Sequence, residues 1–149
     1  MENRMEERTL TCVMDGRVVS VSELWERAPG GGFAVIPSGG FWASLWRRLR
    51  GVKEIRVFSP ADGVVTVVEG SRITLRTGDG VLLNVELGEG GEVTALLGEK
   101  LHRGAPLGKS GVHPALVVFP NPEQITELHV AAGRCRRGRC AAFYRVREA

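Results

Sequence analysis

Histidine offers this chain its widest range of acid–base, nucleophilic and metal chemistry, and it is scarce. The only histidines are His102, His113 and His129. A pair at metal-ligand spacing would predict a zinc site, but these three stand singly along the chain. His102 falls in a predicted Leu-His-Arg-Gly turn, where an isolated histidine is typically exposed to solvent. We therefore expect neither a metal site nor a cofactor from this set.

The cysteines are also three in number: Cys12, Cys135 and Cys140. An odd count argues against a disulfide framework and is typical of a reducing cytoplasm. Cys135 and Cys140 flank Arg-Arg-Gly-Arg, so they could face each other across a hairpin. Zinc would need two further ligands, of which Cys12 supplies one. Ordinary strand cysteines are therefore the first interpretation, and a redox pair is the alternative.

Charge and hydropathy point to a cytoplasmic globular protein. The net charge is +3 and the isoelectric point about 9.1. Basic residues cluster at 47–50 and 134–139, but neither cluster has the aromatic residues of a single-strand stacking platform, so we expect no nucleic-acid partner. Residues 1–8 form a polar tail without the apolar core of a signal peptide. No apolar run reaches the ~18 residues that span a membrane.

The elements that must position these side chains are predicted to be strands. Residues 12–21 and 59–68 both place an Asp-Gly turn before a Val-rich run, which predicts a tight reversal followed by a strand. Residues 98–107 and 133–142 form a second similar pair, each with two spaced glycines before small or apolar residues. This duplication predicts an all-β sandwich or barrel with quasi-twofold symmetry, in one domain spanning 9–149.

Other segments complete the expected fold. Residues 121–128 predict a short helix, with Asn121 as cap and Pro122 at its first position. Four more stretches predict strands, at 33–36, 72–76, 81–87 and 115–119. The core should draw on Val18, Val19, Val21, Val65, Val67, Leu75, Leu83, Val85, Val117 and Val118.

An amphipathic helix is predicted as an insert at about 41–51. Its apolar stripe has helical spacing and consists of Phe41, Trp42, Leu45, Trp46 and Leu49. A helix this short needs a surface to lie on. Three surfaces are open at this point: the domain's own barrel, a partner chain, or a lipid interface, which the flanking arginines would favour.

Taken in order, these segments resemble the glucose-type enzyme IIA of the bacterial sugar phosphotransferase system. Val-Met-Asp-Gly at 13–16 and Ser-Pro-Ala-Asp-Gly at 59–63 are similar to its two Pro-Val-Asp-Gly motifs. Residues 30–37 resemble its Gly-Asp-Gly-Ile-Ala-Ile-x-Pro segment, and 80–88 its active strand. Residues 115–125 resemble its C-terminal Pro-Val-Val-x-x-Asn-x-x-x-Ile. The resemblance implies that family's β-sandwich or barrel, with the active surface on one exposed face.

The departures from the family pattern bear on function. The resemblance places the phosphoryl-accepting histidine at Glu86 and the second, orienting histidine near Ser71. Phosphoryl transfer between histidines needs a neutral imidazole, whereas a carboxylate repels the phosphoryl group. We therefore expect a degenerate, non-catalytic relative that binds a protein partner without cofactor or metal. The expected partner surface comprises Asn84, Glu86, Ser71, Thr94, Trp42 and Trp46.

Two other functions stay open on the sequence. One is a working phosphocarrier of sugar uptake that uses a non-histidine acceptor, such as an acyl phosphate on Glu86. The other is a membrane-surface adaptor that acts through the Trp42 and Trp46 helix. A biotin- or lipoate-type carrier is disfavoured, because Lys109 lacks the flanking methionines of such a lysine.

Overall fold

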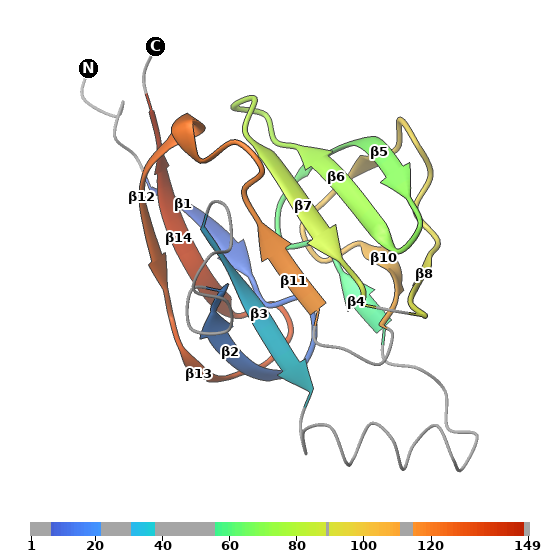
Figure 1. The fold of residues 1–149 in the computed structure, drawn as a ribbon, viewed down its shortest axis with the longest axis horizontal. Helices are drawn as coiled ribbons and strands as arrows, with labels where there is room; N and C mark the ends of the chain where they lie inside the picture. Colours follow the sequence, from blue (N-terminus) through green and yellow to red (C-terminus); the bar gives the residue numbers. More distant parts are fainter. Residues whose placement is uncertain (1–6, 22–30, 38–55, 89, 111–114, 148–149) are drawn as a thin grey trace.

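The computed structural model describes residues 7–21, 31–37, 56–88, 90–110 and 115–147, and the fold is all-β (Figure 1). The helix expected at about 41–51, with Trp42 and Trp46, lies outside the described residues, as does His113. The first strand already begins at Glu7, so the end of the segment expected as a polar tail, 1–8, belongs to a strand.

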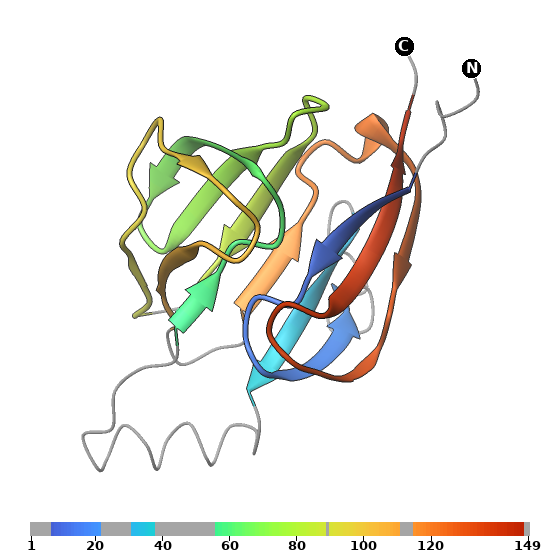
Figure 2. The same cartoon turned by 180° about the vertical axis from the view of Figure 1, so that it is seen from behind.

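The described strands form three antiparallel sheets. The long sheet runs in the order β13 (Gly133–Cys135), β2 (Gly16–Ser20), β3 (Gly32–Pro37), β11 (Ala115–Val118), β7 (Leu82–Glu86), β6 (Arg72–Arg76), β5 (Gly63–Glu69), β9 (Lys100–Leu101). A second sheet orders β1 (Glu7–Thr11), β14 (Cys140–Val146) and β12 (Ile125–Val130). The third orders β4 (Arg56–Phe58), β10 (Pro106–Lys109) and β8 (Glu92–Val93). The β1–β14–β12 sheet covers one half of the long sheet, and β4–β10–β8 covers the other (Figures 1 and 2).

The core lies between these layers. In β7 buried and half-buried side chains alternate, as expected of a strand with one face covered. Phe119 and Tyr144 meet edge-on, with ring centroids 5.1 Å apart. The long sheet contributes the buried side chains Val18, Phe33, Val35, Ile73, Leu75, Leu83, Val85 and Val117. The covering sheets contribute Leu10, Val57, Leu107, Ala142 and Tyr144.

Two residues expected in the core lie on the other face of the long sheet. Val67 is 38% exposed, because the β5–β6 register shifts between Val65, opposite Leu75, and Val67, opposite Thr74. This bulge adds one residue to β5 and turns Val67 outward. Val118 is half-buried, since it alternates with the inward-facing Val117. The other expected core residues are buried: Val18, Val19, Val21, Val65, Leu75, Leu83, Val85 and Val117.

The helix expected at 121–128 is reduced to one turn. A 3-10 helix, η2, spans Pro122–Gln124, and Asn121 precedes it without a side-chain capping bond. From Ile125 onward the chain is β12, paired with β14 along its length. The local helix signal of Asn121 and Pro122 was correct for one turn only, because strand pairing with β14 satisfies the backbone that follows.

The predicted duplication is visible in backbone hydrogen bonds. The two segments that lead into the Asp-Gly turns run side by side: Thr11 N–H donates to Pro60 O at 3.0 Å, and Phe58 N–H donates to Val13 O at 2.9 Å. The same exchange in both directions is what a quasi-twofold axis between the segments produces. The two halves of the domain therefore meet at these segments.

Each Asp-Gly turn also accepts a hydrogen bond from a second turn, and the geometry is the same in both halves. Asp15 Oδ1 accepts from the backbone N–H of Arg137 at 2.7 Å. Asp62 Oδ1 accepts from the backbone N–H of Arg103 at 2.6 Å. A carboxylate that satisfies an otherwise free turn N–H is a common reason for aspartate in such positions. The aspartates of the repeated motif are therefore structural residues in both halves.

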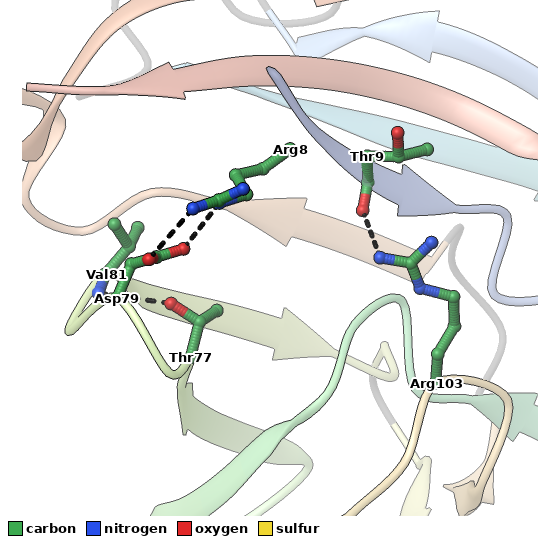
Figure 3. A network of polar contacts seen from close by, with 6 residues as sticks. All are labelled: Arg8, Thr9, Thr77, Asp79, Val81 and Arg103. Atoms are coloured by element: carbon green, nitrogen blue, oxygen red, sulfur yellow. Dashed lines mark hydrogen bonds and ion pairs between the residues drawn. The ribbon is translucent and has the colours of Figure 1, made fainter. Parts of the chain in front are cut away.

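A polar bridge joins β1 to the opposite half of the domain (Figure 3). Arg8 binds Asp79 in the β6–β7 turn through two bonds, Nε to Oδ2 at 2.7 Å and Nη2 to Oδ1 at 3.2 Å. Arg103 Nη2 donates to the carbonyl oxygen of Thr9 at 2.8 Å. Two arginines thus connect the β1–β14–β12 sheet with the half that contains β5, β6 and β7.

Candidate partner-binding face

Ser71 is placed by the tight β5–β6 hairpin. Glu69 lies opposite Arg72, which leaves Gly70 and Ser71 as a two-residue loop. Gly70 has φ +59° and Ser71 does not have a positive φ, the pattern of a type II′ turn. The Ser71 carbonyl accepts from the N–H of Leu87 at 2.9 Å. The hairpin therefore brings Ser71 beside the end of β7.

Glu86 occupies that end of β7. In register it lies between Arg72 of β6 and Leu116 of β11, and its side chain is half-buried. Arg72 Nη2 pairs with Glu69 at 3.3 Å, while its Nε is buried without a hydrogen-bond partner. The structure thus gathers Ser71 and Glu86 at one place, in an environment of one cation and two carboxylates.

Asn84 lies two residues earlier on the same side of β7. Its Oδ1 accepts from the hydroxyl of Thr74 at 2.7 Å. The register continues this row in both directions, to Val67 on β5 and to Val118 on β11. A buried hydroxyl paired with an amide holds the Asn84 side chain in one orientation.

We call this surface the outer face. It combines apolar and polar side chains: Val67, Arg72, Thr74, Asn84, Glu86, Leu116 and Val118. Val67 is 38% exposed, and Leu116 and Val118 are half-buried. An apolar strip bordered by charged residues is the usual composition of a protein-binding surface. The described acid–base groups of this face are the carboxylates Glu86 and Glu69, of which Glu69 is paired with Arg72.

Thr94 belongs to a different part of the fold. It follows β8, and its N–H donates to Leu107 O at 2.8 Å, which ties it to β10 in the third sheet. Its side chain is exposed. The expected partner residues are thus brought together in part: Ser71, Asn84 and Glu86 share one region, and Thr94 lies with β10. Trp42 and Trp46 are outside the described residues.

The two described histidines lie away from the outer face. His102 is exposed in the turn after β9, where its carbonyl accepts from Ala105 N–H at 2.9 Å. His129 lies on β12, stacked on Phe143 with centroids 4.9 Å apart and 3.4 Å from a Glu127 oxygen. Neither ring is therefore positioned to serve Glu86 or Ser71.

Comparison with known proteins supports the architecture. No protein-family model matches the chain, and no curated protein matches its sequence. Among solved structures it is similar to glucose permease IIA from Mycoplasma capricolum, with a TM-score of 0.72 and 17% sequence identity. The match covers 93% of this chain and 96% of that one. The fold is that of glucose permease IIA. At this identity the likeness shows the IIA-like fold alone.

Two further observations on the IIA-like fold concern metals and membranes. Across the part of the chain that the structure describes, no three His, Cys, Asp or Glu side chains form a group that could hold a metal ion. Within the same ranges, no helix has the length and apolar character needed to cross a bilayer.

The cysteines are arranged differently from the pair considered on the sequence. Cys135 Sγ lies 3.6 Å from the carbonyl oxygen of Cys140, but the thiol whose pKa it influences is that of Cys12, in the core that Cys135 packs against. Burial raises the pKa of the Cys12 thiol to about 12, and the neighbouring Cys135 adds to the shift. Sequence reasoning missed this pair, because the two residues are far apart in the chain.

Proposed function

We propose that this chain is a cytoplasmic, enzyme IIA-like component of the bacterial sugar phosphotransferase system that binds a protein partner without carrying a phosphoryl group. The observation that carries the proposal is the outer face. Its exposed Val67 and half-buried Leu116 and Val118 share a face with Glu86, where the resemblance expects the accepting histidine, and Leu116 lies directly opposite Glu86. The chain's three free cysteines fit a reducing compartment.

Electrostatics disfavour a phosphoryl group at this position. A phosphoryl group carries two or more negative charges, and Glu86 is itself a carboxylate. The nearest cation in register, Arg72, is already paired with Glu69 at 3.3 Å. Neutral imidazole, the nucleophile of histidine-based transfer, is absent from β6 and β7. The outer face therefore has the apolar side chains that favour protein binding, but β6 and β7 lack the imidazole that phosphoryl transfer would use, and the nearest cation in register with Glu86 is already paired.

Binding can be tested with the histidine phosphocarrier protein of the same system as the probe. Calorimetric titration of the full chain should give measurable affinity, and Val67→Asp should weaken it at least about tenfold by placing a charge in the apolar strip. Thr126→Asp, on exposed β12, is the matched control and should leave affinity unchanged. Equal affinity of the wild type and Val67→Asp would remove the outer face as the binding site.

Phosphorylation requires a separate experiment. The chain is incubated with phosphoenolpyruvate and the general phosphotransferase proteins, and its intact mass is then measured at neutral pH. We expect the unmodified mass. A phosphate on a stoichiometric fraction of molecules would instead establish a phosphocarrier, and its loss in Glu86→Gln would assign it to an acyl phosphate on Glu86.

A further inference from the structure

The β1–β2 turn is bound directly to the turn between β13 and β14. Cys12 N–H donates to the carbonyl oxygen of Arg139 at 2.7 Å, and the Cys12 carbonyl accepts from Gly138 N–H at 3.1 Å. Cys135 is the last residue of β13 and enters this second turn. The backbone of Cys12 is therefore fixed in position against the segment that carries Cys135.

The two thiols are neighbours within this arrangement. Cys135 packs against the buried core that contains Cys12, and its thiol is near enough to raise the pKa of the Cys12 thiol. Cys12 is 1% exposed, whereas Cys135 is half-buried and reachable from solvent. A disulfide requires two sulfur atoms that can approach without movement of the backbone, and the bonded turns hold Cys12 and Cys135 as neighbours. The third cysteine, Cys140, directs its Sγ elsewhere, to the carbonyl oxygen of Ala142 at 3.6 Å.

The second half of the domain contains the same turn without sulfur. Ser59 N–H donates to Ala105 O at 2.7 Å, and Ser59 O accepts from Gly104 N–H at 2.9 Å, which repeats the two bonds of Cys12. Gly104 and Gly138 both have φ +86°. Ser59 is therefore the structural equivalent of Cys12.

The position facing it is equivalent as well. Leu101 lies opposite Gly63 in the β9–β5 pair, as Cys135 lies opposite Gly16 in the β13–β2 pair. The turn thus forms equally well with serine and leucine at these two positions. Only the first half has cysteine at both positions, and the second half shows that the turn forms without them.

We propose that Cys12 and Cys135 are an oxidation site, at which they form a reversible disulfide that links the β1–β2 turn to the β13–β14 turn. The oxidant is a low-molecular-weight disulfide such as oxidised glutathione. The Cys135 thiolate attacks one glutathione sulfur, a mixed disulfide forms, and one glutathione thiolate leaves. Cys12 then gives its proton to solvent and attacks Cys135 Sγ, which releases the second glutathione thiolate. Two protein thiols are oxidised, and one glutathione disulfide is reduced to two thiols.

Burial fixes the order of these steps. Cys12 is closed to solvent, so Cys135 must meet the oxidant first and Cys12 must resolve the mixed disulfide. The raised pKa of Cys12 keeps it largely protonated at neutral pH. Ring closure should therefore accelerate with pH, by up to about tenfold per unit as the thiolate fraction grows.

Tryptic mapping without reduction tests the pairing, because arginines separate all three cysteines. Cys12 falls in the peptide 9–17, Cys135 in 135–136 and Cys140 in 140–145. After treatment of the full chain with oxidised glutathione and alkylation, we expect 9–17 joined to 135–136, with Cys140 alkylated. Alkylated Cys12, or a link from 9–17 to 140–145, would overturn the proposal.

Thermal unfolding provides the second measurement. A disulfide between Cys12 and Cys135 closes a loop that contains most of the chain, so it should raise the melting temperature by about 10 °C over the reduced protein. Cys140→Ser should keep this gain, and Cys12→Ser should lose it while remaining folded, since Ser59 shows that serine fits the turn. A gain that persists in Cys12→Ser, or is absent from the wild type, would contradict the proposed bridge.

Discussion

Cys12 and Ser59 occupy equivalent positions in the two halves of the domain, and each donates its side-chain hydrogen to the carbonyl two residues further along. Cys12 Sγ donates to Met14 O at 3.0 Å, and Ser59 Oγ donates to Ala61 O at 2.7 Å. Both then lead into an Asp-Gly turn. The domain is therefore assembled from two copies of one turn unit, and substitutions at equivalent positions should have similar effects.

The repeated aspartates give the first prediction. Asp15→Ala and Asp62→Ala should each lower the free energy of unfolding by about 1–2 kcal/mol, because each leaves a turn N–H without its acceptor. Asn variants, which keep a side-chain oxygen, are the matched controls and should lose less. Urea unfolding measures all four. Alanine variants as stable as the wild type would show that water replaces the carboxylates at no cost.

Much of the fold could be predicted from local signals. The Asp-Gly turns at Asp15 and Asp62 and the Val-rich runs after them depend on residues adjacent in sequence, so the strands and the duplication were recoverable. The bulge that exposes Val67 could not be predicted, because it is defined by the register with β6. The strand at Ile125 was missed for the same reason, since it depends on pairing with the distant β14.

The candidate site was predictable to a similar degree. Ser71 and Glu86 were linked only through a family resemblance, and the β5–β6–β7 topology is what places them together. Thr94 was assigned to the same surface from its sequence position, but its backbone bond goes to Leu107. The proximity of Cys12 and Cys135 depends on how the two turns meet in space, which spacing alone does not show.

The second prediction uses the chain's single tyrosine, whose ionisation can be followed without ambiguity. Burial raises the pKa of Tyr144, and the charge of Asp79 raises it further, while a hydrogen bond with Thr77 lowers it. Asp79→Asn should therefore lower the Tyr144 pKa, and Thr77→Val should raise it. Difference absorbance of tyrosinate across an alkaline titration measures both. Shifts in the reverse directions would contradict this account of the charges around the phenol.

The third prediction concerns the close approach of β3 and β11. A Cβ on Gly32 would collide with the carbonyl oxygen of Val117 and with Val118. Gly32→Ala should therefore cost several kcal/mol or prevent folding, since the colliding atoms belong to backbone. Gly78→Ala is the control, because a Cβ there meets nothing within 4 Å and its φ is not positive. Melting temperatures compare the two, and equal values would mean that β3 can shift away from β11.

The fourth prediction concerns alkaline stability of the reduced protein. The Cys12 pKa is raised from 9.0 to about 12 in the folded state, so above pH 9 the folded chain holds a proton that the unfolded chain loses. Stability should fall by about 1.4 kcal/mol per pH unit from this group as pH rises above 9. Cys12→Ser should remove that part of the decline. Urea unfolding at pH 8 and pH 10 in reductant measures the difference, and parallel declines would contradict it.

The last prediction returns to the outer face and depends on the proposed function. Glu86→His supplies an acceptor, but we expect it to gain at most a trace of phosphate from the phosphocarrier protein, because one imidazole without a partner lacks the group that sets its tautomer and position. The bond from Leu87 N–H to Ser71 O places the two positions side by side, so Ser71→His combined with Glu86→His should accept clearly more.

Thr94→His combined with Glu86→His is the control, since Thr94 is bonded to β10. Mass spectrometry at neutral pH counts the phosphate on each variant. Full phosphorylation of Glu86→His alone would show that this site needs no second histidine, and equal yields from the two double variants would show that Ser71 does not contact the reacting position.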